Sequence, residues 1–369
     1  MDAKKRKLKI AMFCTNEWPT PPPENTFYAP LWIADYIAEG LAKKGHQVYY
    51  FGSKESKLKY AKLFSFGMPA LKYNKELSSF LSLNSEVTVN FYEQMMLSKI
   101  YQMDQKEHFD IIHIHPYRRV LPFAPLTKTP TVITVHDPIQ GFHRYILKQT
   151  KKIKNIHLIS ISNSQRKPEP KLKYAGTVYN GINLEKFHFQ EKPKDFFLVA
   201  GRFVPEKGID IAIKVARKAK IKLKIAGGPT QGNYFKEKIK PYLNKNIEYV
   251  GMVNYYQMEK LYRQAKGVLY PLRWEEPFGL ILIEAMACGT PVIAFNKGSI
   301  PEIIKDGKTG FIVKNTNEMI KAIKKIYRMP ETEYKKMRHN CRKYVEKNFS
   351  LEKMTGEYEK IYYRILKKL

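Results

Sequence analysis

Short apolar runs alternate with longer segments in which apolar residues recur at helical spacing along most of the chain. The short runs predict buried strands, and the periodic segments predict amphipathic helices. Strands that alternate with helices indicate parallel sheets covered by helices, an α/β class. The first series of predicted strands is 9–14, 47–53, 109–115, 131–137 and 157–162, with a helix over 29–45. The second series is 196–202, 222–228, 247–252, 267–272 and 291–295, with helices over 208–220 and 257–265.

Two such series predict two Rossmann-like domains in one chain. The charged, proline-containing segment 190–195 is the expected boundary, which gives domains over 1–190 and 195–349. The final helix, within 350–369, is expected to pack back onto the first domain. Since ligands of open α/β sheets bind beyond the carboxyl ends of the strands, two facing domains predict a cleft that holds the site.

Composition narrows the class of protein. With 369 residues and 44% hydrophobic content, the chain is long enough for two cores. No apolar run is long enough for a membrane span, and the first residues contain too few apolar positions for a signal peptide, so a cytoplasmic location is expected. The three cysteines are far apart and form no C-x-x-C pair. Free thiols and no metal site are therefore expected.

The formal net charge of +31 suggests an anionic partner: nucleic acid, an acidic membrane surface or a phosphorylated substrate. Most of the basic residues are lysines spread along the whole chain. This distribution favours a generally positive surface over one compact nucleic-acid reader. A nucleic-acid or anionic-surface binding protein nevertheless stays open as an alternative function.

The segment 199–208, VAGRFVPEKG, predicts an anion site. Arg202 directly follows a predicted strand, and Lys207 and Gly208 stand at the entry of the next helix. Two cations and the amides of a helix N-terminus would together bind a diphosphate. A solvated surface loop is the alternative interpretation.

The segment 275–284, EEPFGLILIE, carries two carboxylates. Glu284 lies in an apolar helix, where a buried carboxylate is costly without a polar partner. Glu276 precedes the same helix, whose first amides point out of its N-terminus. Their separation of eight does not bring the two carboxylates side by side on a helix, so we expect them to bind different parts of one ligand.

These two segments resemble the retaining glycosyltransferases of family 4, which have the GT-B fold. The resemblance extends over most of the chain through GHQVYYFGS, FDIIHIH, TVHD, VYNGINLEKF and GSIPEIIKDGKTGFIV, and through the terminal helix. It implies a GT-B architecture: two facing Rossmann-like domains, a cleft between them, and a C-terminal helix that crosses back to the first.

The resemblance also implies roles for particular residues. Arg202 and Lys207 would hold the diphosphate of a nucleotide sugar, and Glu276 would bind hydroxyls of the transferred sugar. Glu284 would accept hydrogen bonds from the nucleotide ribose, and His136 would lie near the sugar and the acceptor. The backbone expected beside the sugar is that of Phe278, Gly279 and Leu280.

The expected function is transfer of a hexosyl unit, with retention, from a nucleotide diphosphate sugar to an acceptor hydroxyl. UDP-glucose is the first choice of donor, and UDP-N-acetylglucosamine and GDP-mannose stay open. No metal or other cofactor is expected, because Arg202, Lys207 and a helix dipole can neutralise the diphosphate. No specific nucleic acid is expected as a partner.

Two features concern the acceptor, which the sequence does not identify. Ala29 and Pro30 stand where family members usually have a Gly-Gly pair, so a relative that has lost catalysis is a further alternative. Many family members act on lipid-linked acceptors. A short basic amphipathic stretch suggests peripheral contact with an anionic membrane. It consists of Leu58, Ala61, Leu63 and Phe64, with Lys57, Lys59 and Lys62 around them. A solvated helix is the alternative interpretation of that stretch.

Overall fold

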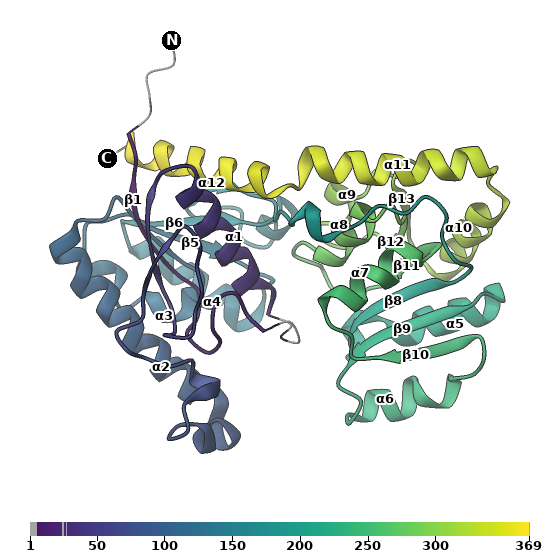
Figure 1. The fold of residues 1–369 in the computed structure, drawn as a ribbon, viewed down its shortest axis with the longest axis horizontal. Coiled ribbons are helices and arrows are strands. Elements are labelled where there is room, and N and C mark those ends of the chain that lie inside the picture. Colours follow the sequence, from purple (N-terminus) through teal and green to yellow (C-terminus); the bar gives the residue numbers. More distant parts are fainter. Residues whose placement is uncertain (1–5, 24–25, 27, 369) are drawn as a thin grey trace, which may run out of the picture. The chain divides into compact units, whose positions relative to one another are not determined.

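The computed structural model describes residues 6–23, 26 and 28–368. The chain forms two compact units, Met1–Tyr179 with Leu351–Leu369, and Asn180–Ser350. Each unit is built on one parallel sheet flanked by helices (Figure 1). The α/β class predicted from the alternating pattern is confirmed.

The first unit has a seven-stranded sheet in the order β3-β2-β1-β4-β5-β6-β7, and its paired strands are parallel. Because side chains alternate along a strand, each strand contributes to both faces. One face packs against α2, α3 and α4, and the other packs against α1 and α12 (Figure 1). The strands are β1 (Lys9–Phe13), β2 (Gln47–Phe51), β3 (Lys62–Phe64), β4 (Ile111–Ile114), β5 (Thr131–Val135), β6 (Ile156–Ser160) and β7 (Tyr174–Thr177). The helices are α1 (Ala29–Lys43), α2 (Ser78–Glu107), α3 (Tyr117–Val120), α4 (Gly141–Gln149) and α12 (Leu351–Leu366).

The terminal helix α12 packs on the first unit, as predicted. Its small and polar residues fit closely there: a Cβ placed at Gly40 of α1 would lie 2.5 Å from the Oγ1 of Thr355. Glu359 of α12 pairs with Lys44 at 2.7 Å and with His46 at 2.9 Å. The end of the chain is therefore part of the first unit's core.

The second unit has a six-stranded sheet in the order β10-β9-β8-β11-β12-β13. Helices α5 and α10 share an apolar core with one face of this sheet, and α8 packs on α7, α11 and β12. The strands are β8 (Phe197–Arg202), β9 (Leu223–Gly228), β10 (Ile247–Gly251), β11 (Gly267–Tyr270), β12 (Val292–Phe295) and β13 (Gly310–Val313). The helices are α5 (Ile209–Ala219), α6 (Asn233–Lys238), α7 (Tyr255–Gln264), α8 (Leu280–Ala287), α9 (Ile300–Ile303), α10 (Thr316–Arg328) and α11 (Glu331–Asn348).

The division between the units falls at Tyr179 and Asn180, earlier than the 190–195 expected from charge and proline. The reason is packing. The backbone N–H of Ile182 donates to the carbonyl of Phe349, and the guanidinium of Arg338 donates to the carbonyl of Gln190 at 2.9 Å. Residues 180–190 therefore belong to the second unit.

The basic stretch around residues 57–64 is a loop followed by β3, not an amphipathic helix. One of its apolar side chains is used by the fold, since the ring of Phe64 stacks on Tyr49 at 5.0 Å and on Phe51 at 5.6 Å. Among the described residues, no helix combines the length and the apolar character that crossing a bilayer requires.

Candidate functional site

In the second sheet the order of the strands reverses between β8 and β11. Loops that leave the carboxyl ends of two such strands diverge to opposite faces, and ligands of open α/β sheets bind at this place. Arg202 is the last residue of β8, and Lys207 follows in the loop to α5. Glu276 lies in the loop that follows β11. The fold thus brings two of the predicted cations and one predicted carboxylate to the same edge.

Glu276 is held by three hydrogen bonds to one of its oxygens. Its Oε2 accepts from the Nζ of Lys207 at 3.1 Å, from the hydroxyl of Tyr270 at 2.9 Å and from the indole N–H of Trp274 at 3.1 Å. The residue is 8% exposed. Its Oε1 has no hydrogen-bond partner in the described part of the chain. One oxygen therefore orients the carboxylate, and the other is available to a ligand.

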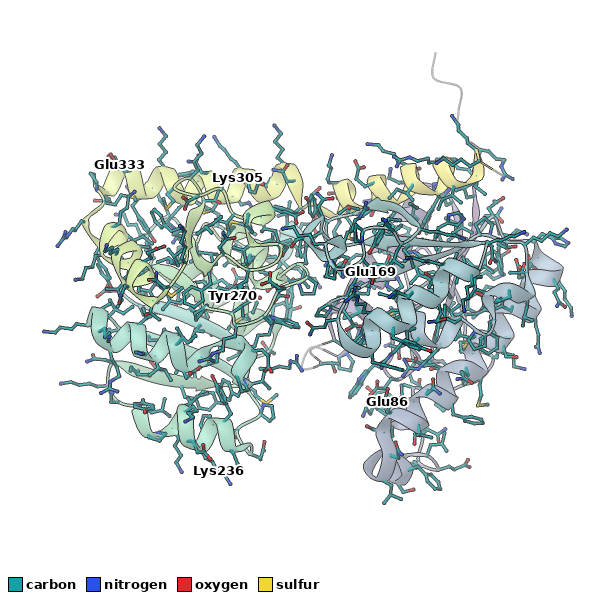
Figure 2. The ribbon with its side chains drawn as sticks, turned by 180° about the vertical axis from the view of Figure 1, so that it is seen from behind. Glu86, Glu169, Lys236, Tyr270, Lys305 and Glu333 are labelled. Carbon is teal, nitrogen blue, oxygen red and sulfur yellow. The ribbon has the colours of Figure 1, made fainter. Side chains whose placement is uncertain are left out.

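Tyr270 ends β11 inside the second unit, whereas Lys236, Lys305 and Glu333 lie at the periphery (Figure 2). Burial and the nearby Glu276 raise the pKa of the Tyr270 phenol well above its ordinary value. The phenol is therefore protonated at neutral pH and donates its hydrogen bond to the carboxylate.

The two cations at this edge differ in their surroundings. Lys207 is half-buried, and its ammonium lies over the ring of Trp274 at 4.6 Å from the centroid as well as beside Glu276. Arg202 is exposed, and its side chain makes no ion pair or hydrogen bond with a described residue. One cation is thus preorganised and the other is free to move onto an anion.

Two glycines allow the loops of this edge to pack closely. Gly208 has φ +66°, and a Cβ there would lie 2.0 Å from the carbonyl oxygen of Pro271. At Gly298 a Cβ would lie 2.2 Å from the carbonyl oxygen of Glu276. Larger residues at these positions would displace the loop that carries Glu276.

An ion pair also ties the two loops together. Arg273 donates to both carboxylate oxygens of Asp210 in α5, at 2.8 and 2.6 Å. Such a forked pair fixes geometry better than a single contact does.

Helix α8 begins directly after this loop. Its N-cap Gly279 has φ +87°, a conformation that glycine adopts without strain. The ring of Phe278 is buried against Phe349, so its side chain serves the core. The backbone of 278–280 is the part that can approach a ligand, because the first amides of a helix have no intrahelical acceptor.

Glu284 lies in α8, about one helical turn after the first residue of the helix, Leu280. Its Oε2 accepts a hydrogen bond from the hydroxyl of Tyr262 in α7, at 2.9 Å. Burial raises the pKa of Glu284 to about 7, and the Tyr262 hydrogen bond opposes that rise. The carboxylate therefore has one protein partner, and its proton is held weakly at neutral pH.

In the first unit, His136 directly follows β5, as predicted. Its Nε2 lies 2.8 Å from the Nδ1 of His115, which directly follows β4. Burial lowers the pKa of His136 to about 4, so its ring is neutral at pH 7. A neutral imidazole carries no charge; one of its ring nitrogens donates a hydrogen bond and the other accepts one.

Ala29 and Pro30 form the first turn of α1. Proline suits this position, because the N–H that it lacks would have no partner within the helix. The same substitution removes an amide that a Gly-Gly pair would present. Glu24, Asn25 and Phe27, which precede α1 in the sequence, lie outside the described residues.

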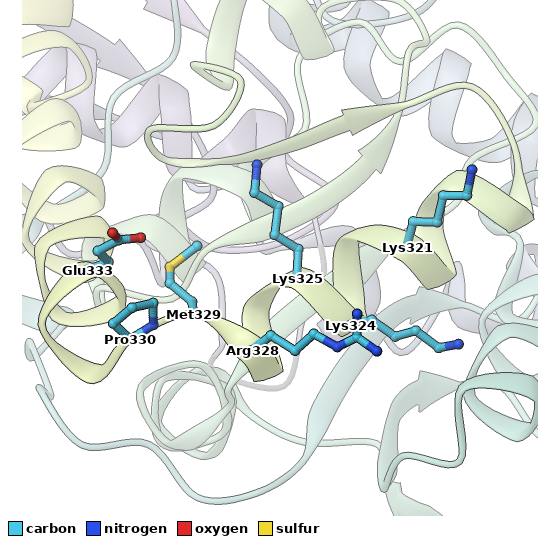
Figure 3. Close-up of a pocket in the computed structure, with 7 residues that line it drawn as sticks. All are labelled: Lys321, Lys324, Lys325, Arg328, Met329, Pro330 and Glu333. Carbon is cyan, nitrogen blue, oxygen red and sulfur yellow. The ribbon is translucent and has the colours of Figure 1, made fainter.

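A hollow beside α10 is lined by none of these residues, and Figure 3 shows the side chains that do line it. Cationic side chains dominate its lining, so it would attract anions without distinguishing them. Its lining residues are Lys321, Lys324, Lys325, Arg328, Met329, Pro330 and Glu333. Within the described ranges, no group of three or more histidine, cysteine or acidic side chains has the arrangement of a metal site. The three cysteines are free, as expected, and the structure shows that all three are buried.

Sequence reasoning missed the residues that orient the predicted ones: Tyr270, Trp274, Tyr262 and His115. Trp274 stands two positions before Glu276 in the sequence, so this short spacing could have identified it as a partner of the carboxylate. Tyr262 and His115 approach their partners only through tertiary packing.

Two family profiles match the chain, one over most of each unit. The profile of Glycosyltransferase Family 4 matches residues 33–186, and the profile of Glycosyl transferases group 1 matches residues 182–348. The N-acetyl-alpha-D-glucosaminyl L-malate synthase of Bacillus anthracis is 24% identical over 376 aligned positions, which cover 91% of this chain and 93% of that protein. An uncharacterized glycosyltransferase of Methanocaldococcus jannaschii is 29% identical over 277 residues, with 70% and 76% of the two chains covered.

Solved structures share the fold. The sucrose-phosphate synthase of Thermosynechococcus elongatus superposes with a TM-score of 0.72 at 18% identity, covering 98% of this chain and 100% of that chain. The Anabaena protein HepE, solved in complex with UDP and glucose, has a TM-score of 0.69 at 15% identity, again covering 98% and 100%. These likenesses show a shared fold, and the two profiles, which together span residues 33–348, show that the chain belongs to the family 4 glycosyltransferases and is a glycosyltransferase enzyme.

Proposed function

We propose that the enzyme transfers a hexosyl unit from a nucleotide diphosphate sugar to an acceptor hydroxyl with retention of configuration and without a metal ion. The observation that carries the proposal is the meeting of Lys207 and Glu276 at the edge between β8 and β11, with their nitrogen and oxygen 3.1 Å apart. A cation for the leaving diphosphate and a carboxylate for the sugar are adjacent there, as the reaction requires.

The diphosphate leaves with negative charge, and Arg202 and Lys207 would stabilise it. Lys207 is already held in place by Glu276 and Trp274. A preorganised charge stabilises a leaving group without the cost of reorganising at the moment of reaction. Arg202 would complete the site when the donor binds. Two cations of this kind supply the charge that a divalent metal supplies elsewhere.

Glu276 and Glu284 would hold the other parts of the donor. The free Oε1 of Glu276 suits a hydroxyl of the transferred sugar, and the backbone of 278–280, which leads into the first turn of α8, suits its oxygens. Glu284 would accept hydrogen bonds from the ribose through the oxygen that Tyr262 does not occupy. His136 of the first unit would bind an oxygen of the sugar or the acceptor.

UDP-glucose is the first donor to test. HepE has been solved with UDP and glucose, but at that level of identity the likeness supports the fold alone. The named relatives include an N-acetylglucosaminyl enzyme and an O-antigen mannosyltransferase of Escherichia coli. UDP-N-acetylglucosamine and GDP-mannose are therefore the two competing donors.

A thermal-shift panel of nucleotide sugars tests the proposal. A donor present at 100 times its Kd should stabilise the fold by about 2.7 kcal/mol, and other nucleotide sugars should do so less. Labelled RNA in a parallel titration tests the alternative that the net charge of +31 serves nucleic-acid binding. No stabilisation by any nucleotide sugar, together with tight RNA binding at physiological salt, would overturn the proposal.

Product analysis with the stabilising donor tests turnover. Slow hydrolysis of the donor, even without an acceptor, would show that Ala29 and Pro30 have not abolished catalysis. Acceptors linked to lipids, added in detergent, are the first class to screen, with soluble sugars as the comparison. Sedimentation with anionic vesicles at low and high salt measures whether the enzyme also attaches to a membrane.

A further inference from the structure

Three histidine rings form a row in the first unit. The rings of His113 and His115 stack with centroids 4.6 Å apart, and those of His115 and His136 stack at 5.1 Å. His113 lies in β4, and His115 follows the strand directly while its N–H still donates to the carbonyl of Phe13 in β1. Residues two apart in an extended chain point to the same side, so both rings lie on one face of the sheet. This face is covered by α12, whose Tyr362 hydroxyl lies 2.7 Å from the Nδ1 of His113.

The inner end of the row is fully hydrogen-bonded. Beyond its contact with Tyr362, His113 has its Nε2 at 2.8 Å from the hydroxyl of Thr134, which lies 3.0 Å from the hydroxyl of Tyr358. Each of these hydroxyls can donate or accept. Both nitrogens of His113 therefore keep a hydrogen-bond partner in either tautomer.

His115, in the middle, has only one partner. Its Nδ1 lies 2.8 Å from the Nε2 of His136. Its Nε2 is buried and has no hydrogen-bond partner among the described residues. The outer ring, His136, is half-exposed, and its Nδ1 makes no hydrogen bond to a described residue.

Each of the three rings carries a single ring hydrogen at neutral pH. Burial lowers the pKa of His113 to about 3 and that of His136 to about 4, and it places the pKa of His115 well below the ordinary value. Exactly one hydrogen must lie between His115 and His136, because an N–H···N bond has one donor and one acceptor.

Two arrangements satisfy that condition. If His136 donated from Nε2, the hydrogen of His115 would sit on Nε2 as a buried N–H without an acceptor. If His115 donates from Nδ1, its Nε2 is a bare acceptor. Buried N–H groups without a partner are rarer in proteins than acceptors without one. The second arrangement places the hydrogen of His136 on its outer nitrogen, Nδ1.

We propose that His115 is a positioning residue that holds His136 in the Nδ1–H tautomer, so that His136 meets the substrates as a hydrogen-bond donor and not as a base. The proposal rests on the proposed function in one respect, the contact of His136 with a sugar or acceptor oxygen. The tautomer itself is a property of the free enzyme. A donor at this place would stabilise an oxygen that gains negative charge during transfer.

Long-range proton–nitrogen correlation spectra of the full chain, labelled with nitrogen-15 histidine, read the tautomer directly. His136 and His115 should both show a protonated Nδ1 and a bare Nε2. Assignment comes from the spectra of the His136→Gln and His115→Asn variants. A protonated Nε2 on His136 in the wild type would overturn the proposal.

A pair of variants of similar side-chain volume tests the consequence. In His115→Asn the amide group can donate from nearly the same place as Nδ1, whereas His115→Leu cannot donate. His115→Leu should release His136 to the Nε2–H form, which the isolated side chain favours, and should lower kcat about tenfold with little change in KM. His115→Asn should retain the Nδ1–H signal and most of the turnover. Equal loss of kcat in both variants would contradict a positioning role.

Failure of this inference and failure of the proposed function give different results. If His136→Gln has wild-type turnover while the Nδ1–H signal is present, the contact with substrate is wrong and the tautomer stands. If His136→Gln lowers turnover but the wild type shows Nε2–H, the contact stands and the role of His115 is wrong. The wild-type spectrum decides the tautomer even if the His115→Leu variant does not fold.

Discussion

The carboxyl edges of the two sheets have the same topology but opposite chemistry. Beyond β8 and β11 of the second unit, Lys207, Glu276 and Arg202 provide formal charges. Beyond β4 and β5 of the first unit, His115 and His136 are neutral rings in contact with each other. A shared fold therefore fixes only the edge of the sheet at which a site forms. The loop residues decide whether that place binds an ionic group or recognises neutral oxygens.

Loss of the sugar-binding carboxylate should have the largest effect. In Glu276→Gln the amide can still accept at one oxygen, but the negative charge is gone and Lys207 loses its partner. We expect kcat to fall about 100-fold or more while nucleotide binding is retained. Steady-state kinetics and calorimetric titration with the free nucleotide measure the two quantities. Glu206→Gln, a change at an exposed glutamate of the neighbouring loop, is the matched control.

Loss of either cation at the charged edge, the edge between β8 and β11, should have the next largest effect on kcat. Arg202→Ala and Lys207→Ala should each lower kcat about tenfold to 100-fold, because each removes one stabilising charge from the leaving diphosphate. The double variant should lose less than the product of the two factors, since both act on one group. EDTA should leave the wild-type rate nearly unchanged. Strong inhibition by EDTA that a divalent ion reverses would show that a metal takes part.

Glu284 should make donor binding depend on pH. Ribose hydroxyls donate to a carboxylate, so binding favours the ionised form, and the raised pKa of about 7 makes that form scarce below pH 7. The Kd for the nucleotide sugar should therefore rise as the pH falls from 8 to 6, by at most about tenfold per pH unit, and level off above pH 8.

In Glu284→Gln this pH dependence should disappear, because the amide does not titrate. A nucleotide sugar is the right probe, since its diphosphate has no terminal phosphate that titrates in this range. If wild type and variant bind equally at every pH, the partner of Glu284 is structural, with Tyr262 as its contact.

Loss of the histidine beyond β5 should have the smallest effect on kcat. His136→Gln removes one hydrogen bond and no charge, so kcat should fall about tenfold. Because burial lowers the pKa of His136 to about 4, the ratio of the wild-type rate to the variant rate should be constant between pH 5.5 and 8. A ratio that changes near pH 6.5 would mean that His136 titrates there and acts through its charge.

The sequence supported the fold more fully than the site. Apolar periodicity located the strands of both sheets to within a few residues, apart from the short edge strands β3, β7 and β13. The sequences of β3 and β7, KLF and YAGT, carry a weak apolar signal, whereas β13, GFIV, is apolar but only four residues long. Periodicity also predicted that the terminal helix packs on the first unit, because tyrosines and leucines recur at helical spacing there. The boundary between units was placed too late, since charge and proline mark exposure and not the partner on which a segment packs.

For the site, sequence motifs identified residue types but not their contacts. Lys207 and Glu276 are 69 positions apart, and only the strand order brings them to one edge. The hydrogen bonds that orient Glu276 come from Tyr270 and Trp274, and a tyrosine at a strand end has no sequence feature that distinguishes it from a core residue. The row of histidines depends on alternation along β4 and on where α12 packs.

A titration of the stabilising nucleotide sugar into the nitrogen-15-labelled enzyme, followed by amide chemical shifts, tests whether the donor binds at the edge between β8 and β11 of the second sheet. We expect the amides of residues 202–208 and 276–281 to shift in proportion to occupancy, while those of 321–333 around the cationic hollow of α10 do not (Figure 3). Shifts confined to 321–333, with none at 202–208 or 276–281, would contradict the account.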